Sequence, residues 1–116
     1  MKLLIKKSEI KRIQEHPGST FHEYNLPFQN VSVGVSEISG RYPHSGFDVD
    51  QEVEQVWYIE QGKGRVWLLN SFYELSEGDM VLIPKGEKYW IEGTNLKLVV
   101  VSSPPWFPKQ HTHISK

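Results

Sequence analysis

One stretch decides the fold of this chain: residues 78–89, with the sequence GDMVLIPKGEKY. Met80–Ile83 is a short apolar run of strand-type residues, and Gly78 before it can take the positive φ that a tight turn needs. Pro84 cannot donate a hydrogen bond to a neighbouring strand, so we expect the strand to end there. This order of turn, buried strand and turn is typical of a small antiparallel β-protein.

The composition suits one folded domain with one core. The sequence has 116 residues, of which 38% are hydrophobic and 23% are charged. The net charge is -1 and there is no cysteine, so we expect no nucleic-acid partner, no disulfide and no cysteine-ligated zinc. No apolar stretch has the length of a membrane span, and residues 1–13 lack the apolar core of a signal peptide. We therefore expect a cytoplasmic protein with no membrane partner.

Short strands separated by turn residues recur along the chain. The clearest is 30–38, NVSVGVSEI, in which valines alternate with small polar residues. The other expected strands are 1–5, 21–26, 54–60, 64–69, 72–75, 80–83, 89–92 and 96–101. We expect turns between them, including one at 93–95, and a single helical turn near Ser8–Glu15. The pattern predicts an all-β fold with minimal helix, either a closed barrel or a sandwich.

The glycine and proline spacing of the opening stretch resembles the second motif of the cupins, G-x5-P-x-G-x2-H-x3-N. Gly78, Pro84 and Gly86 occupy its glycine and proline positions, and Gly62 occupies the last glycine of the first cupin motif. The resemblance implies one cupin-type antiparallel jelly-roll β-barrel over 1–116, with a pocket between its sheets. Its expected parts are N-terminal edge strands at 1–39, a cupin core at 40–104 and a tail at 105–116 that runs over the surface.

The positions that hold metal ligands in the family carry other residues in this chain. Gln55 stands at the glutamate position, and Tyr89 stands at the histidine position of the second motif. The two histidine positions of the first motif fall within 48–51, which contains no histidine. Neutral amides and protonated phenols bind divalent metals poorly. We therefore predict no metal at the usual site and no cofactor.

Alternation along the strand expected at 54–60 defines a candidate pocket. Successive side chains point to opposite faces, so Gln55 and Trp57 should face inward while Val56 and Tyr58 face outward. The ligand-binding residues expected from this pattern and from the resemblance are Gln55, Trp57, Tyr89, His44 and Tyr42. Aromatic faces beside amide and phenol groups suit a neutral polar ligand such as a sugar. The alternative is that these side chains only fill the barrel, with Gln55 hydrogen-bonded to Tyr89.

Histidines supply the other candidate chemistry. His44 lies close in sequence to Asp50 and Gln55, and the three could form a reduced metal site or an acid–base site. His111 and His113 would share a face of an extended tail and could grip a metal there. A polar tail near a terminus is more often solvated, which is the simpler interpretation of that pair.

Three functions stay open from the sequence, and none identifies a catalytic residue. The first is a small-molecule-binding barrel without the usual metal, the second a cupin-type enzyme such as an isomerase or epimerase, and the third a filled barrel that acts as an interaction module. We also expect a homodimer, because small cupins often pair and because sheet edges must be covered. The residues expected to supply apolar surface for pairing, or for packing the tail, are Val56, Tyr58, Trp106 and Phe107.

Overall fold

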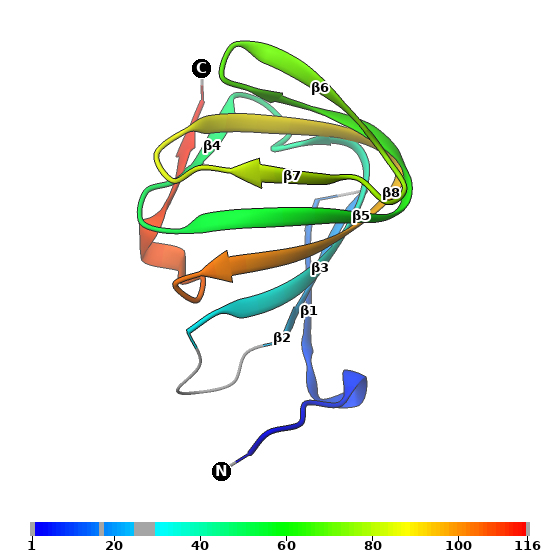
Figure 1. Cartoon of the computed structure of the whole chain (residues 1–116), viewed down its shortest axis with the longest axis vertical. Helices are drawn as coiled ribbons and strands as arrows, with labels where there is room; N and C mark the ends of the chain where they lie inside the picture. Colours follow the sequence, from blue (N-terminus) through cyan, green and yellow to red (C-terminus); the bar gives the residue numbers. More distant parts are fainter. Residues whose placement is uncertain (1, 17, 25–29, 116) are drawn as a thin grey trace.

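The computed structural model describes residues 2–16, 18–24 and 30–115, which form one curled sheet (Figure 1). Its strands are β1 (Lys11–His16), β2 (Ser19–Tyr24), β3 (Ser32–Tyr42), β4 (Phe47–Asp50), β5 (Glu54–Leu68), β6 (Ser71–Ser76), β7 (Met80–Ile83), β8 (Lys88–Ser103) and β9 (His111–Ile114). All of their pairings are antiparallel. The helical content of the described residues is two 3-10 turns, at Lys7–Glu9 and Pro108–Gln110. The prediction of an all-β antiparallel fold with minimal helix is confirmed.

Two long strands organise the sheet. The strand order is β1-β2-β3-β8-β4-β9, and β5 pairs with β6, β7 and β8. β5 has 15 residues and β8 has 16, and both curve strongly in Figure 1. The buried core lies on the inner face of this curve, where Ile59, Val66 and Leu98 are at most 1% exposed. Because the sheet curls around its inner face, β1 and β2 near the N-terminus and β9 near the C-terminus border the same space.

The expected turns at residue 62 and at 93–95 are wrong, because both segments lie inside continuous strands. Gly62 has a φ of 84°, and the pairing of β5 with β8 shifts register on either side of Gln61. A Cβ atom on Gly62 would lie 2.1 Å from the carbonyl oxygen of Asn95. The glycine signal therefore marks a bulge where two paired strands bend together, which a local pattern does not distinguish from a turn.

The N-terminal expectations are corrected in part. Residues 2–5 carry no regular structure, although a strand was expected at 1–5, and Met1 lies outside the described residues. The helical turn is only Lys7–Glu9, and Lys11–His16 is strand β1. The helical signal here is only Ile10 and Ile13, three residues apart, and the pairing of β1 with β2 outweighs it. The strand expected at 21–26 is β2, and its last two expected positions lie outside the described residues.

The C-terminal tail is part of the sheet rather than a segment on the surface. Its strand β9 pairs with β4 in the register Asp48↔His113 and Asp50↔His111. Residues 40–50, between the strands expected at 30–38 and 54–60, contain the end of β3 and all of β4. The expectation of a loose tail is wrong because β4 offers it an open edge, a pairing between residues about 60 positions apart that local patterns do not show.

The predicted alternation along β5 is confirmed. Gln55 is 7% exposed and Trp57 is 4% exposed, whereas Tyr58 on the opposite face is 48% exposed. Tyr89 on β8 is 5% exposed and faces the same interior. No helix in the described residues is long and apolar enough to cross a membrane.

Candidate functional site

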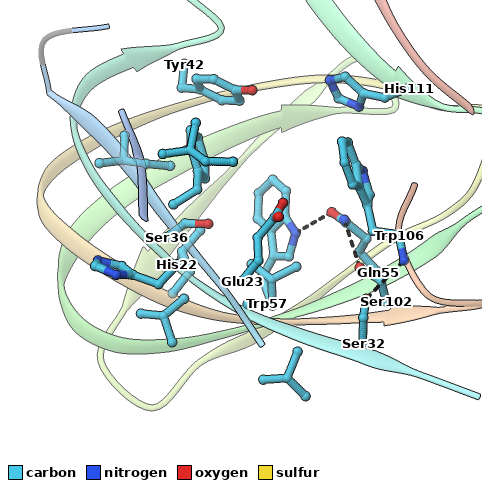
Figure 2. Close-up of a pocket in the computed structure, with 18 of the residues that line it drawn as sticks. His22, Glu23, Ser32, Ser36, Tyr42, Gln55, Trp57, Ser102, Trp106 and His111 are labelled. Atoms are coloured by element: carbon cyan, nitrogen blue, oxygen red, sulfur yellow. Dashed lines mark hydrogen bonds between the residues drawn. The ribbon is translucent and has the colours of Figure 1, made fainter. Parts of the chain in front are cut away.

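The inner face of the curled sheet borders a partly open cavity of about 420 Å³. Residues of β1, β2 and β3 line one side, residues of β5 and β8 line the other, and Trp106, Pro108 and His111 of the tail close one end. Figure 2 shows Gln55 and Trp57 facing this space. Ligand pockets commonly measure roughly 300 to 1,000 Å³, so the cavity has room for a small metabolite.

Two hydrogen bonds fix the side chain of Gln55 in the cavity wall. Trp57 Nε1 donates to Gln55 Oε1 at 2.9 Å, and Gln55 Nε2 donates to Ser102 Oγ at 3.1 Å (Figure 2). A primary amide has two N–H donors and two oxygen lone pairs, so one donor and one acceptor position remain beyond these bonds. The structure thus pairs Gln55 with Trp57 and Ser102 instead of the expected Tyr89.

Tyr89 forms the wall beside Trp57. The two ring centroids are 5.2 Å apart, and the ring planes meet at 79°, an edge-to-face contact. Burial raises the pKa of the Tyr89 phenol well above its ordinary value, and the negative charges of Asp50 and Asp48 raise it further. The phenol therefore stays protonated at neutral pH, and a hydrogen bond to Asp50 also favours this form.

Four side chains at the closed end form what we call the Asp–His cluster: Asp48, Asp50, His111 and His113. The Nδ1 atom of His111 lies 2.8 Å from Asp50 Oδ1, and its Nε2 atom lies 3.0 Å from Asp48 Oδ2. The Nδ1 atom of His113 lies 2.9 Å from Asp48 Oδ1. The cluster joins β4 to β9 through side chains as well as through backbone pairing.

The same Asp50 oxygen accepts two further hydrogen bonds from the tail. Trp106 Nε1 donates to it at 3.1 Å, and Gln110 Nε2 donates to it at 2.8 Å. Trp106 also packs against the His111 ring, with centroids 5.6 Å apart. Asp50 is 1% exposed, so these donors offset the cost of burying its charge. Trp106 therefore packs the tail, which is one of the two roles expected for these apolar residues, and Phe107 is 37% exposed.

The cluster holds His111 in its protonated form. Burial alone lowers the pKa of His111, but hydrogen bonds to Asp48 and Asp50 outweigh burial and raise it from 6.5 to about 9. Burial likewise opposes ionisation of Asp48, and the hydrogen bonds from the two histidines outweigh it, which lowers the pKa of that carboxyl. Both N–H groups of His111 point at carboxylates, so its role in the cavity wall is structural.

Two charged residues that the sequence did not predict, Lys11 and Glu23, also line the cavity. Lys11 on β1 and Glu23 on β2 lie opposite each other in the strand register, and both line the cavity. Figure 2 shows Glu23 reaching into the space that Trp57 faces. Alternation from Phe21 would have placed Glu23 on the same face, but nothing local showed which face was inside. Lys11 adds a positive charge to the lining, which the neutral polar ligand expected from the sequence did not take into account.

The structure gathers four of the five expected ligand-binding residues around the cavity. Gln55, Trp57, Tyr89 and Tyr42 line it, whereas His44 is not among the lining residues. Since Asp50 bonds to the tail and His44 does not line the cavity, the structure does not assemble the reduced site expected from His44, Asp50 and Gln55. Of the expected tail histidines, His111 lines the cavity, and both bond to aspartates.

The residues at the family's metal positions do not fit a divalent cation. Gln55 bonds to Trp57 and Ser102, and Tyr89 keeps its proton, so neither offers a free anionic donor. Across residues 2–16, 18–24 and 30–115, no group of three or more histidine, cysteine, aspartate or glutamate side chains is arranged to hold a metal ion. The absence of metal remains a prediction for the purified protein.

Fold and site together define a cupin-like barrel with a ligand-sized interior. The chain belongs to the family described as the AraC-like ligand binding domain, which it matches over residues 33–94. The cupin resemblance drawn from the glycine and proline spacing is confirmed. No curated protein matches the chain in sequence.

Solved structures share the fold at low sequence identity. The nucleoside dehydratase Pac13 is 16% identical with a TM-score of 0.88, covering 99% of this chain and 92% of its own. A structure of Streptomyces Pac13 with uridine superposes equally well. Ectoine synthase from P. lautus is 15% identical with a TM-score of 0.76, covering 97% of this chain and 90% of its own. KdgF from Halomonas sp. is 17% identical with a TM-score of 0.72, covering 90% and 94%. At these identities the likeness concerns the fold.

Proposed function

We propose that the chain binds a small polar molecule, with sugar-like hydroxyl or amide groups, inside the curled sheet. The observation that carries the proposal is a cavity of about 420 Å³ whose wall holds the Gln55 amide in a fixed orientation through its hydrogen bond to Trp57, with Tyr89 packed against the Trp57 ring. Trp57 and Tyr89 can stack against a flat ligand, and Gln55 can exchange hydrogen bonds with its polar edge.

Two further findings support ligand binding over a filled barrel. Side chains that only filled the barrel would leave little room on its inner face, whereas a space of about 420 Å³ remains there. The family is a ligand-binding one, and a protein of the same fold is known with uridine, a molecule that carries a sugar. The polar side chains around the cavity are therefore better explained as ligand contacts than as filling.

The test is ligand-induced thermal stabilisation across a panel of sugars, nucleosides and other small polar metabolites. We expect at least one class to raise the melting temperature of the natural protein and to lose that effect in Gln55→Leu, which keeps volume and removes hydrogen bonding. The matched control is Gln61→Leu, because Gln61 is exposed and does not line the cavity. A panel that stabilises neither protein, or that stabilises Gln55→Leu as strongly as the natural chain, would reject the proposal.

We further propose that two copies of the chain pair through the outer face of the sheet. The strand registers align two apolar rows across β7, β5, β8 and β3. One row is Leu82, Val56, Val101 and Val33, and the other is Met80, Tyr58, Val99 and Val35. Leu82, Met80 and Tyr58 are each more than 40% exposed, and neither row contains a charge. An uncharged face can meet its own copy across a two-fold axis without repulsion, which favours a second copy as the occupant.

A further inference from the structure

The carboxylate of Glu23 is a cavity-facing charge without a partner among the described residues. Glu23 lies on β2 and lines the cavity, and Figure 2 shows its side chain reaching into the space that Trp57 faces. No hydrogen bond or ion pair joins it to any other described residue, although Lys11 stands opposite in the strand register. A half-buried carboxylate beside apolar walls is costly unless something compensates its charge.

Aromatic rings surround the same space. Phe21 and Tyr42 line it with centroids 5.0 Å apart at an interplanar angle of 60°, and Trp57 forms the opposite wall. The face of an aromatic ring carries negative electrostatic potential and attracts cations, with indole the strongest of the side chains. Rings and a carboxylate facing one space together favour a positively charged group.

Negative charges beside the cavity also favour a positively charged ligand. Asp48 and Asp50 stand at the closed end, where their negative charge is one cause of the raised pKa of Tyr89. Three basic side chains line the cavity: Lys11, which is exposed, His22, which bonds to Glu37 at 2.7 Å, and His111, which bonds to these aspartates. With His111 neutralised in this way, Glu23 and Lys11 are the charges left to meet a ligand.

We infer that the ligand of this cavity is a small organic cation, whose ammonium group sits between the Glu23 carboxylate and the aromatic rings. The inference rests on the proposed function and narrows its ligand class. Glu23 supplies the ion pair, Trp57 and Tyr42 supply cation–π contacts, and Gln55 receives the polar remainder of the molecule. Lys11 opposes the cation, so removing its charge should strengthen binding.

The experiment uses matched charged and neutral probes and a signal inside the cavity. Benzylamine is compared with benzyl alcohol, and choline with its uncharged carbon analogue, by titration followed through the indole N–H NMR signal of Trp57. That signal reports on the site because Trp57 Nε1 donates to Gln55. In the natural protein we expect at least one ammonium probe to bind tenfold or more tightly than its neutral partner.

Three variants complete the test. Glu23→Gln should bring each charged and neutral pair to equal affinity, and Lys11→Met should widen the preference for the cation. Glu74→Gln, at an exposed position on β6 that does not line the cavity, should leave the preference unchanged. Equal binding of charged and neutral probes to the natural protein, or a preference that survives Glu23→Gln, would overturn the cation inference and leave the small-molecule cavity standing. Binding of no probe, in a protein that the wider panel also leaves unstabilised, would overturn both.

Discussion

His111 Nδ1 lies 2.8 Å from Asp50 Oδ1, which ties the last strand of the chain to the end of β4. Asp50 is 1% exposed and receives three donors on that one oxygen, from Trp106, Gln110 and His111. The contact adds to the backbone pairing of β4 with β9 at one end of the cavity, so the charge of His111 contributes to holding the tail there.

The first prediction concerns stability at alkaline pH. The folded state raises the pKa of His111 from 6.5 to about 9. A raised pKa gives stability that is complete below 6.5 and is lost as the pH rises through about 9. The difference corresponds to about 3 kcal/mol as an order of magnitude. Urea denaturation between these values should show the free energy of unfolding falling as the pH rises.

The variant His111→Gln should be less stable than the natural protein near neutral pH and should lose most of this alkaline slope. The control is His44→Gln, because His44 does not line the cavity and stands outside the Asp–His cluster. An unchanged slope in His111→Gln would show that another group titrates. The lowered pKa of Asp48 acts in the opposite direction, since its contribution is present above the ordinary value of 3.8 and is lost on acidification.

The second prediction concerns the bend at Gly62. An alanine there must hold a φ of 84° and place its Cβ 2.1 Å from the carbonyl oxygen of Asn95. We expect Gly62→Ala to lower the free energy of unfolding by about 3 kcal/mol, which is the upper end of the cost of local backbone strain. The measurement is urea denaturation.

The control variant Gly78→Ala separates the cost of a positive φ from the cost of a Cβ atom that clashes with the backbone. Gly78 has a φ of 90°, but a Cβ atom there would meet nothing within 4 Å. Gly78→Ala should therefore lower the free energy of unfolding only by the cost of holding an alanine in the left-handed conformation, about 1 kcal/mol. Equal losses for the two variants would mean that β5 and β8 separate easily at the bend.

The third prediction concerns pairing of two chains. Replacing Tyr58 or Leu82 by lysine puts a charge into the outer apolar rows, so we expect a dimer of the natural protein to become a monomer in light scattering. Tyr73→Lys is the control, since Tyr73 is 43% exposed on β6 outside these rows. A natural protein that scatters as a monomer at micromolar concentration would reject pairing through this face.

Much of the fold could be predicted from the sequence, because strand alternation and turn residues are local features. Alternation along β5 was enough to place Gln55 and Trp57 inside, and the run at 80–83 corresponds to β7. The same local logic failed at Gly62, because a glycine in a bulge and a glycine in a turn satisfy the same backbone requirement.

The parts of the site that escaped prediction depend on distant pairings. His111 and Asp50 are 61 residues apart, and their contact exists only because β9 adds to the edge of β4. Glu23 faces the cavity only because β2 follows β3 around the curl of the sheet. Glu23 and His111 belong to no motif, and periodicity alone does not tell the inner face of a strand from its outer face.

The last prediction tests the Gln55–Trp57 hydrogen bond in the cavity wall by a double-mutant cycle. Trp57→Phe removes the donor and leaves the buried Gln55 oxygen without it, while Gln55→Leu removes the acceptor and leaves Trp57 Nε1 unpaired. Each single change should cost about 1 to 3 kcal/mol from the unpaired group alone. The double variant leaves neither group orphaned, so its loss in urea denaturation should be smaller than the sum of the two by about 1 kcal/mol or more. Additive losses would show that the bond does not couple the two side chains, and that packing alone positions Gln55.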